Sequence, residues 1–191
     1  PGRCAWANRG MVRFGITLLV ITMLAQSECA TLGDARPWED SLQMKFVPVP
    51  GTEVLFCIWE TRVRDYEAFA KATGREWSKP DFAQGPSHPA VNVSWDDATA
   101  FCAWLTILER KAGRIASNQC YRLPTDAEWM TLINEAGGET VAAGALKSTS
   151  SLWTAPNVAD NSTGFSALPA GNCYNCGTGG SCDLLSTHAE F

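Results

Sequence analysis

Two helix start signals constrain this chain more than any other feature of its sequence. Ser94 is followed three residues later by Asp97, and Thr125 is followed three residues later by Glu128. In such a capping box the hydroxyl accepts a hydrogen bond from a first-turn amide, while the acidic side chain favours the positive end of the helix. Apolar residues then recur at helical spacing until a glycine ends each run. The chain is therefore predicted to contain two amphipathic helices that each bury one face.

Strand and helix patterns precede these two helices. Residues 44–49 alternate and residues 54–59 are continuously apolar and rich in β-formers, with a Pro-Gly turn between them, which predicts a β-hairpin. Apolar positions at helical spacing over residues 63–73 predict a helix that Gly74 ends. A further short strand is predicted at residues 120–123.

Length and charge narrow the classes of function. The chain has 191 residues, which suits one domain, because typical domains hold roughly 100 to 200 residues. The formal net charge is −5, and the basic residues form no cluster. Proteins that bind nucleic acid typically carry a basic patch, so no nucleic acid partner is expected.

The first 27 residues have the pattern of a segment that directs export. Arg13 supplies a positive flank, residues 14–25 are mainly apolar, and a small-x-small cleavage site ends at Ser27. This order is typical of a secretory signal peptide. The predicted divisions are a leader of no recognisable pattern at residues 1–10, a signal peptide at 11–27, a linker at 28–43 and an incomplete domain at 44–191.

The short apolar stretch also bears on location. A helix needs about 20 residues to cross a bilayer, and this stretch is shorter, so no transmembrane anchor is expected. The predicted location is periplasmic, cell-surface or secreted. Two alternatives remain open, which are a buried N-terminal helix and a lipid anchor at Cys29, although Glu28 fits the lipidation motif poorly.

Residues 139–191 differ in composition from the rest of the chain, because they contain few apolar runs and many Gly, Ser, Thr and Asn residues. Such a loop-rich lobe is expected to be tied down by side chains, disulfides or a metal. Cys173, Cys176 and Cys182 are the disulfide candidates in an exported chain, with Cys176 and Cys182 the preferred pair. A zinc site completed by Cys120 or His188, or free thiols, are the alternatives.

Other cysteine and tryptophan positions are explained best by packing. Cys102 lies on the apolar face of the second capped helix and is predicted to be a small buried residue. Trp95, Trp104 and Trp129 lie in or beside the capped helices and are predicted to be core. Trp153 lies in the polar lobe, where it would either pack in the core or contact a ligand.

Two long motifs, HPAVNVSWDDATAFCAWL at residues 88–105 and YRLPTDAEW at residues 121–129, resemble the formylglycine-generating enzyme family, also called sulfatase-modifying factors. With upstream FVPVPG and TRVRDYEAFAKATG, the resemblance covers about residues 44–136. Residues 137–191 instead resemble the Fibrobacter succinogenes major paralogous domain, a bacterial surface module. Both resemblances imply an α+β fold akin to the C-type lectin fold, with short strands, three capped helices and a loop-rich C-terminal lobe, here truncated.

The first resemblance implies an oxidase in which a late pair of cysteines binds copper(I) and oxidises a substrate cysteine to formylglycine. The corresponding region is absent before Phe191, so no catalytic or cofactor-binding residue is assigned. The expected function is non-catalytic binding of a protein or glycan on the loop-rich lobe. The alternative is a truncated copper-dependent oxidase whose substrate is a sulfatase-type peptide.

The oxidase family also implies a calcium ion, held by an Asn, the next carbonyl, an Asp and a later Phe carbonyl. Asn157, Val158, Asp160 and Phe165 match these parts in a segment rich in the oxygen donors that calcium takes. The alternative is a turn in which Asn and Asp accept hydrogen bonds from their own backbone.

Overall fold

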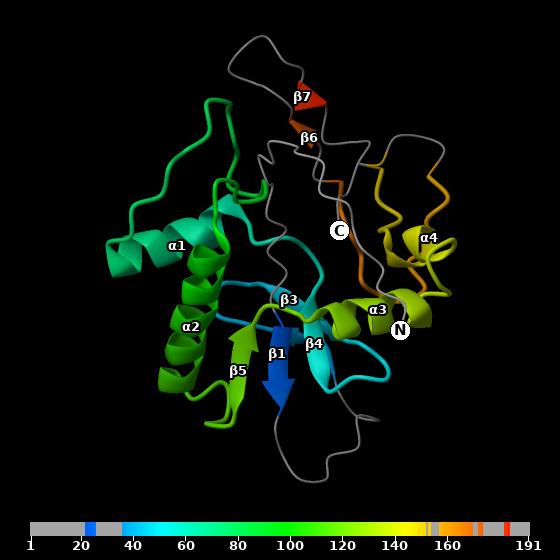
Figure 1. Ribbon diagram of the computed structural model, residues 1–191, viewed down its shortest axis with the longest axis horizontal. Coiled ribbons are helices and arrows are strands. Elements are labelled where there is room, and N and C mark those ends of the chain that lie inside the picture. The colour runs from blue at the N-terminus through cyan, green and yellow to red at the C-terminus, as the bar shows by residue number, and fades with distance from the viewer. Residues whose placement is uncertain are drawn as a thin grey trace, which may run out of the picture.

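A computed structural model describes the backbone and side chains of residues 36–151, 153 and 157–169 (Figure 1). For residues 22–25, 172–173 and 182–183 it describes the backbone only, as strands. Residues 1–10, Cys29 and Cys176 lie outside the described residues. The elements are β1 (Thr22–Ala25), β2 (Trp38–Glu39), β3 (Lys45–Pro48), β4 (Val54–Cys57), α1 (Val63–Thr73), α2 (Trp95–Lys111), β5 (Gln119–Arg122), α3 (Asp126–Glu135), α4 (Ala142–Leu146), β6 (Asn172–Cys173) and β7 (Cys182–Asp183).

A five-stranded antiparallel sheet has the strand order β2-β3-β4-β1-β5, and β6 pairs with β7 separately. The predicted hairpin is confirmed, because β3 and β4 pair with Phe46 opposite Cys57. Pro48 is the last residue of β3 and lies beyond the two residues with which β2 pairs, so its missing N–H leaves no ladder bond broken. The mixture of sheet and helices fits the predicted α+β class.

The three predicted helices are confirmed. The hydroxyls of Ser94 and Thr125 accept from the amides of Asp97, at 3.1 Å, and of Glu128, at 3.3 Å, and both carboxylates bond back to the cap residue. Gly74 ends α1 with φ of 68°, a left-handed conformation that glycine adopts without strain. These ends are fixed by contacts within four residues, which is why the sequence pattern predicts them.

Aromatic packing joins α1 to α2. The Phe101 ring centroid lies 5.9 Å from that of Tyr66 and 5.6 Å from that of Phe69, and Trp104 lies 5.6 Å from Phe69. Each such pair contributes about 0.5–1.5 kcal/mol beyond the area that it buries. Cys102 is buried beside them, as predicted.

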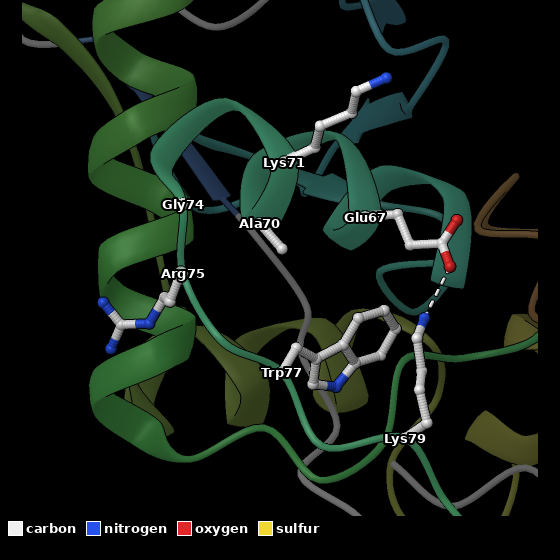
Figure 2. Close-up of a pocket in the computed structure, with 7 residues that line it drawn as sticks. All are labelled: Glu67, Ala70, Lys71, Gly74, Arg75, Trp77 and Lys79. Atoms are coloured by element: carbon white, nitrogen blue, oxygen red, sulfur yellow. Dashed lines mark hydrogen bonds and ion pairs between the residues drawn. The ribbon is translucent and has the colours of Figure 1, made fainter.

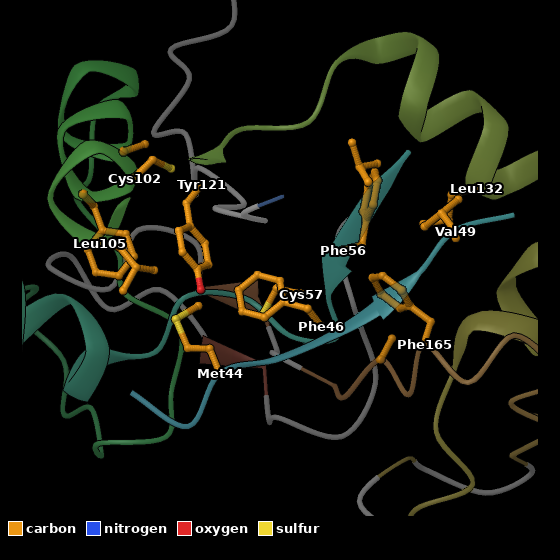
Figure 3. Close-up of a cluster of buried hydrophobic side chains, with 14 of the residues drawn as sticks. Met44, Phe46, Val49, Phe56, Cys57, Cys102, Leu105, Tyr121, Leu132 and Phe165 are labelled. Atoms are coloured by element: carbon orange, nitrogen blue, oxygen red, sulfur yellow. The ribbon is translucent and has the colours of Figure 1, made fainter. Parts of the chain in front are cut away.

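Both faces of the sheet are covered. Phe46 and Tyr121 meet edge to face at 5.5 Å on one face (Figure 3), whereas Phe56, next to the partner of Phe46 in the ladder, lies on the opposite face, 5.1 Å from Trp129 of α3. In Figure 1, α1 and α2 lie to the left of the strands, beyond β5, and α3 and α4 lie to the right.

The prediction that the helix tryptophans are core is right for two of three. Trp104 and Trp129 pack against the core, but Trp95 is 66% exposed. Trp95 is the first residue of α2, and the buried positions of that helix begin at Ala98. The prediction was wrong because helical spacing does not show how far the covering elements extend along a helix.

The structure also contains strands in two segments predicted to lie outside the domain, which are the signal peptide and the linker. Residues 36–43 contain β2 and the turn to β3, and Asp40 in that turn is 3% exposed. β1, which lies inside the predicted signal peptide, pairs with β4 on one edge and with β5 on the other. A segment that is removed after export cannot serve as a strand of the mature sheet, so the two assignments are alternatives for the mature chain.

The outer edge of β5 is closed by α2. The Thr106 hydroxyl accepts from the Tyr121 amide at 2.9 Å and donates to the carbonyl of Cys102 at 2.8 Å. The unpaired amide of an edge strand is thereby satisfied without another strand.

We expect Thr106→Val to lower the free energy of unfolding by about 1–3 kcal/mol, because it leaves the buried Tyr121 amide without an acceptor while keeping the side-chain shape. Urea denaturation of the full chain measures this change. The matched control is Thr99→Val, whose exposed hydroxyl bonds only the Trp95 carbonyl one turn back and whose loss should cost less than about 0.5 kcal/mol. Equal effects of the two substitutions would contradict this role for Thr106.

We also expect a chain that begins at residue 28 to melt at a lower temperature than one that begins at residue 19. The shorter chain lacks β1, so β4 and β5 each lose a hydrogen-bonded neighbour. Thermal melting followed by circular dichroism compares the two, and identical melting temperatures would show that β1 is dispensable and removable as a leader.

Candidate functional site

The segment of the predicted calcium ligands wraps around α4. The Asp160 amide donates to the Gly144 carbonyl at 3.2 Å, and the Thr163 hydroxyl donates to the Ala145 carbonyl at 2.8 Å. An isolated β-bridge between Lys147 and Ala167 also joins the residue after α4 to the chain that follows this segment. Residues 157–165 are therefore held against α4 by hydrogen bonds from the backbone and from the Thr163 side chain to α4 carbonyls.

Within this segment the acidic and amide side chains bond to nearby backbone. Asn157 Oδ1 accepts from the Ala159 amide at 3.2 Å, and Asp160 Oδ1 accepts from the Ser162 amide at 2.9 Å. The bond from Ser162 holds the pKa of the exposed Asp160 carboxyl below its ordinary value. These are the bonds that the turn alternative expects.

The four predicted calcium ligands occupy different environments. Val158 is 80% exposed and the carboxylate of Asp160 is exposed, whereas Phe165 is buried. The amide group of Asn157 also donates to the carbonyls of Ser148, at 3.2 Å, and Ser150, at 3.4 Å. The donors are oxygen atoms of the type calcium takes, and each engaged side-chain oxygen keeps a second lone pair. Among the described residues, no three His, Cys, Asp or Glu side chains gather to hold a metal.

Trp153 forms the centre of the described part of the lobe. It is 6% exposed, its Nε1 donates to the Ser148 hydroxyl and to the Ala167 carbonyl, both at 3.3 Å, and the Lys147 ammonium lies 4.5 Å from its ring. The core interpretation of Trp153 is confirmed.

The disulfide candidates are described only in part. The β6–β7 ladder places Cys173 opposite Cys182, a pairing different from the preferred Cys176 with Cys182. Burial raises the pKa of the Cys57 and Cys102 thiols to about 12, and both are free. Cys120, named as a zinc alternative, is also free and half-buried.

A shallow surface hollow of about 400 Å³ lies beside the end of α1 (Figure 2). Trp77 is fixed there by donation from its Nε1 to the Val91 carbonyl at 2.8 Å. The Lys79 ammonium lies 3.6 Å from the Trp77 ring centroid and 2.6 Å from the Glu67 carboxylate. Sequence reasoning missed this hollow, because Glu67 and Lys79 are separated by the end of a helix and a loop.

Comparison with known proteins gives a consistent picture. Residues 34–165 match the family model of the sulfatase-modifying factor enzyme 1-like domain. The chain is 41% identical over 61 residues to the formylglycine-generating enzyme of Streptomyces coelicolor, covering 29% of this chain and 15% of that protein. It is 33% identical over 85 residues to that of Thermomonospora curvata, covering 42% and 22%.

A mammalian relative matches a segment of similar size. The chain is 38% identical over 61 residues to the formylglycine-generating enzyme of Bos taurus, covering 29% of this chain and 13% of that protein. The aligned segments thus span less than a quarter of these relatives. No solved structure matches the chain.

The calcium ligand set stays a prediction, and Asp160→Asn tests it. This substitution keeps the oxygen that accepts from Ser162 and removes the charge, so the turn is retained while cation affinity falls. We expect calcium chloride to raise the melting temperature of the unsubstituted chain, with about 2.7 kcal/mol of stabilisation at a concentration 100 times Kd, and to stabilise Asp160→Asn less.

The control for this titration is Asp126→Asn, at an exposed carboxylate in the first turn of α3. An equal calcium response of all three chains, or no response, would contradict the predicted site.

Proposed function

The chain belongs to the family of sulfatase-modifying factor enzyme 1-like domains, and from this premise we propose that it is exported, binds a sulfatase-type polypeptide through its loop-rich lobe and does not itself oxidise cysteine. The part of this lobe, residues 139–191, whose side chains the structure describes is residues 139–151, 153 and 157–169. The whole-protein activity of the longer relatives enters only as a candidate, because the aligned segments cover 13% to 22% of them.

The observation that carries this proposal is apolar exposure in the lobe. Val141 is 57% exposed, Val158 is 80% exposed and Leu168 is 39% exposed. The lobe is nevertheless ordered around Trp153 and α4, so these side chains are displayed on a fixed framework. Exposed aliphatic groups on an ordered surface are stabilised when a partner covers them.

Aromatic residues of the lobe favour a polypeptide over a glycan. Sugar-binding sites commonly use an exposed aromatic ring face, but Trp153 and Phe165 are both buried. Aliphatic side chains suit the apolar centre of a protein interface. A glycan ligand is therefore the weaker form of the binding proposal.

Two of the three described thiols are poorly suited to oxidase chemistry. A thiolate is the form of cysteine that ligates copper and reacts as a nucleophile. Cys57 and Cys102 are buried and have pKa values of about 12, so at neutral pH both are thiols without access to substrate.

The second candidate is a copper-dependent oxidase that converts a sulfatase cysteine to formylglycine. It is favoured by the names of the relatives, all formylglycine-generating enzymes. In that case the copper ligands would be cysteines other than the buried Cys57 and Cys102.

Two further parts of the proposal concern fold and location. The α+β arrangement with short strands and a loop-rich lobe supports a C-type-lectin-like fold. The location we propose is periplasmic, cell-surface or secreted, because residues 11–27 have the pattern of a signal peptide. Within the described residues, no helix combines the length and apolarity needed to cross a membrane.

We expect a labelled Cys-x-Pro-x-Arg peptide to bind the full chain and to remain unoxidised in the presence of copper(I) and oxygen. Fluorescence anisotropy measures binding, and mass spectrometry with an oxygen electrode measures conversion. Val158→Ser should weaken binding about fivefold, corresponding to about 1 kcal/mol of lost apolar contact.

Ile107→Ser is the matched control, because Ile107 is 66% exposed on α2, outside the lobe. Oxidation of the peptide would establish the second candidate instead. Absence of binding, or equal weakening by both substitutions, would overturn the proposed role of the lobe.

A further inference from the structure

Charged side chains from both long helices and the loops beside them surround the turn between β2 and β3. This turn, residues 40–43, is called the β2–β3 turn. The three carboxylates beside it, those of Asp40, Asp65 and Glu109, are 3%, 2% and 0% exposed. The turn cluster consists of Asp40, Arg62, Asp65, Glu109 and Arg114.

Two arginines hold the backbone of this region. Arg62 Nη2 donates to the carbonyls of Leu42, at 3.3 Å, and Gln43, at 3.1 Å. Arg114 Nη2 donates to the carbonyl of Glu39 at 2.6 Å. The β2–β3 turn and the strand before it are thus bound from two sides by guanidinium groups.

Each arginine has a carboxylate of its own. Arg62 Nε lies 2.7 Å from Asp65, and Arg114 Nε lies 2.9 Å from Glu109. Glu109 also accepts from the Ser41 hydroxyl and, at 3.2 Å, from the Ser41 amide. Asp65 also has the more exposed Arg64, whose Nε lies 3.7 Å from its carboxylate. Both carboxylates are therefore paired with arginines.

Asp40 is the third carboxylate and has no such arginine. Its Oδ1 accepts from the amides of Leu42, at 2.8 Å, and Met44, at 2.9 Å, so it shapes the turn. Its Oδ2 is buried without a hydrogen-bond partner. A buried carboxylate in this position is costly when ionised and much less costly when protonated.

We propose that the turn cluster is a pH-operated lock on the β2–β3 turn, closed while Asp40 is protonated and loosened when Asp40 loses its proton. Ionisation places a third negative charge beside two carboxylates with which the neighbouring arginines already pair. Opening the turn returns that charge to water and releases β2, which pairs with β3 through two residues only. This lock is independent of the proposed function.

The other groups that face the turn set the pH range. The pKa of Asp40 is raised from 3.8 to about 7. Burial is the largest cause, the amide bonds from Met44 and Leu42 oppose it, and the charges of Glu109 and Asp65 add to it. Burial also raises the pKa of Tyr121 on β5 and of Cys57 on β4, so both are neutral near pH 7.

The sign of the effect follows from the two states of Asp40. In the opened turn the carboxyl regains its ordinary pKa, so between about pH 4 and pH 7 the closed turn holds a proton that the opened turn releases. The stabilisation is therefore full below about pH 4 and is lost as the pH rises through about 7. The opened fraction rises about tenfold per pH unit across this range and is constant above it.

Hydrogen–deuterium exchange of the full chain tests the lock, with peptic fragments that contain residues 40–44 and rates corrected for chemical exchange. We expect their protection to fall about 100-fold from pH 5 to pH 7 and little from pH 7.5 to pH 8.5. Asp40→Asn keeps the oxygen that accepts from Leu42 and Met44 but cannot ionise, so its protection should not vary with pH.

Asp126→Asn, far from the turn in sequence and exposed, should behave as the unsubstituted chain. Protection independent of pH in the unsubstituted chain, or the same pH dependence in Asp40→Asn, would overturn the lock. A carbon NMR titration of the Asp40 carboxyl in the unsubstituted chain gives an answer even if Asp40→Asn does not fold, and a midpoint below pH 5 would also overturn it.

Discussion

The attachment of α2 to the edge strand β5 is the constraint on which the described fold depends. An edge strand has amides and carbonyls without ladder partners, and here the Thr106 hydroxyl supplies the missing acceptor. The same helix directs Phe101 to α1 and Glu109 to the β2–β3 turn. A shift of one residue in the start of α2 would rotate all three by about 100° away from their partners. The capping box at Ser94 thus sets the geometry of the sheet edge, the helix pair and the turn together.

The parts of the fold that the sequence predicts are those fixed by near neighbours. The hairpin, α1 and the two capped helices end where turn residues, caps and glycines place them, because each end is decided within about four residues. The β2–β3 turn was predicted as linker because its partners, Glu109 and Arg114, are about 70 residues away in sequence. A segment written Glu39-Asp40-Ser41 reads as polar and exposed, and only the tertiary contacts show that its carboxylate is buried.

The candidate site shows a different limit, which is that one residue type can serve two kinds of structure. Asn and Asp in residues 157–165 suit both a calcium loop and a turn, since either use depends on the same oxygen atoms. For Trp153 the structure decides between core packing and ligand contact, because the side chain is buried. For Asp160 it does not decide between a turn and a calcium site, because the bond from the Ser162 amide occupies one carboxylate oxygen and leaves the other able to bind a cation. The surface hollow beside Trp77 carried no local signal at all.

The α1–α2 interface and the β2–β3 turn are stabilised by different kinds of interaction. Between α1 and α2 the contacts are aromatic, and several pairs of about 0.5–1.5 kcal/mol each add to apolar burial. Around the β2–β3 turn the contacts are ionic. The Arg62–Asp65 pair is buried, so removal of one partner costs about 3–5 kcal/mol because the other charge is left without compensation, whereas the Arg114–Glu109 pair is screened by solvent on the side of the exposed Arg114. Aromatic packing is insensitive to pH, but a cluster of three carboxylates and two arginines is not. The N-terminal part of the sheet is therefore the part of the described fold in which a proton can change the structure, while the helix pair remains a fixed support.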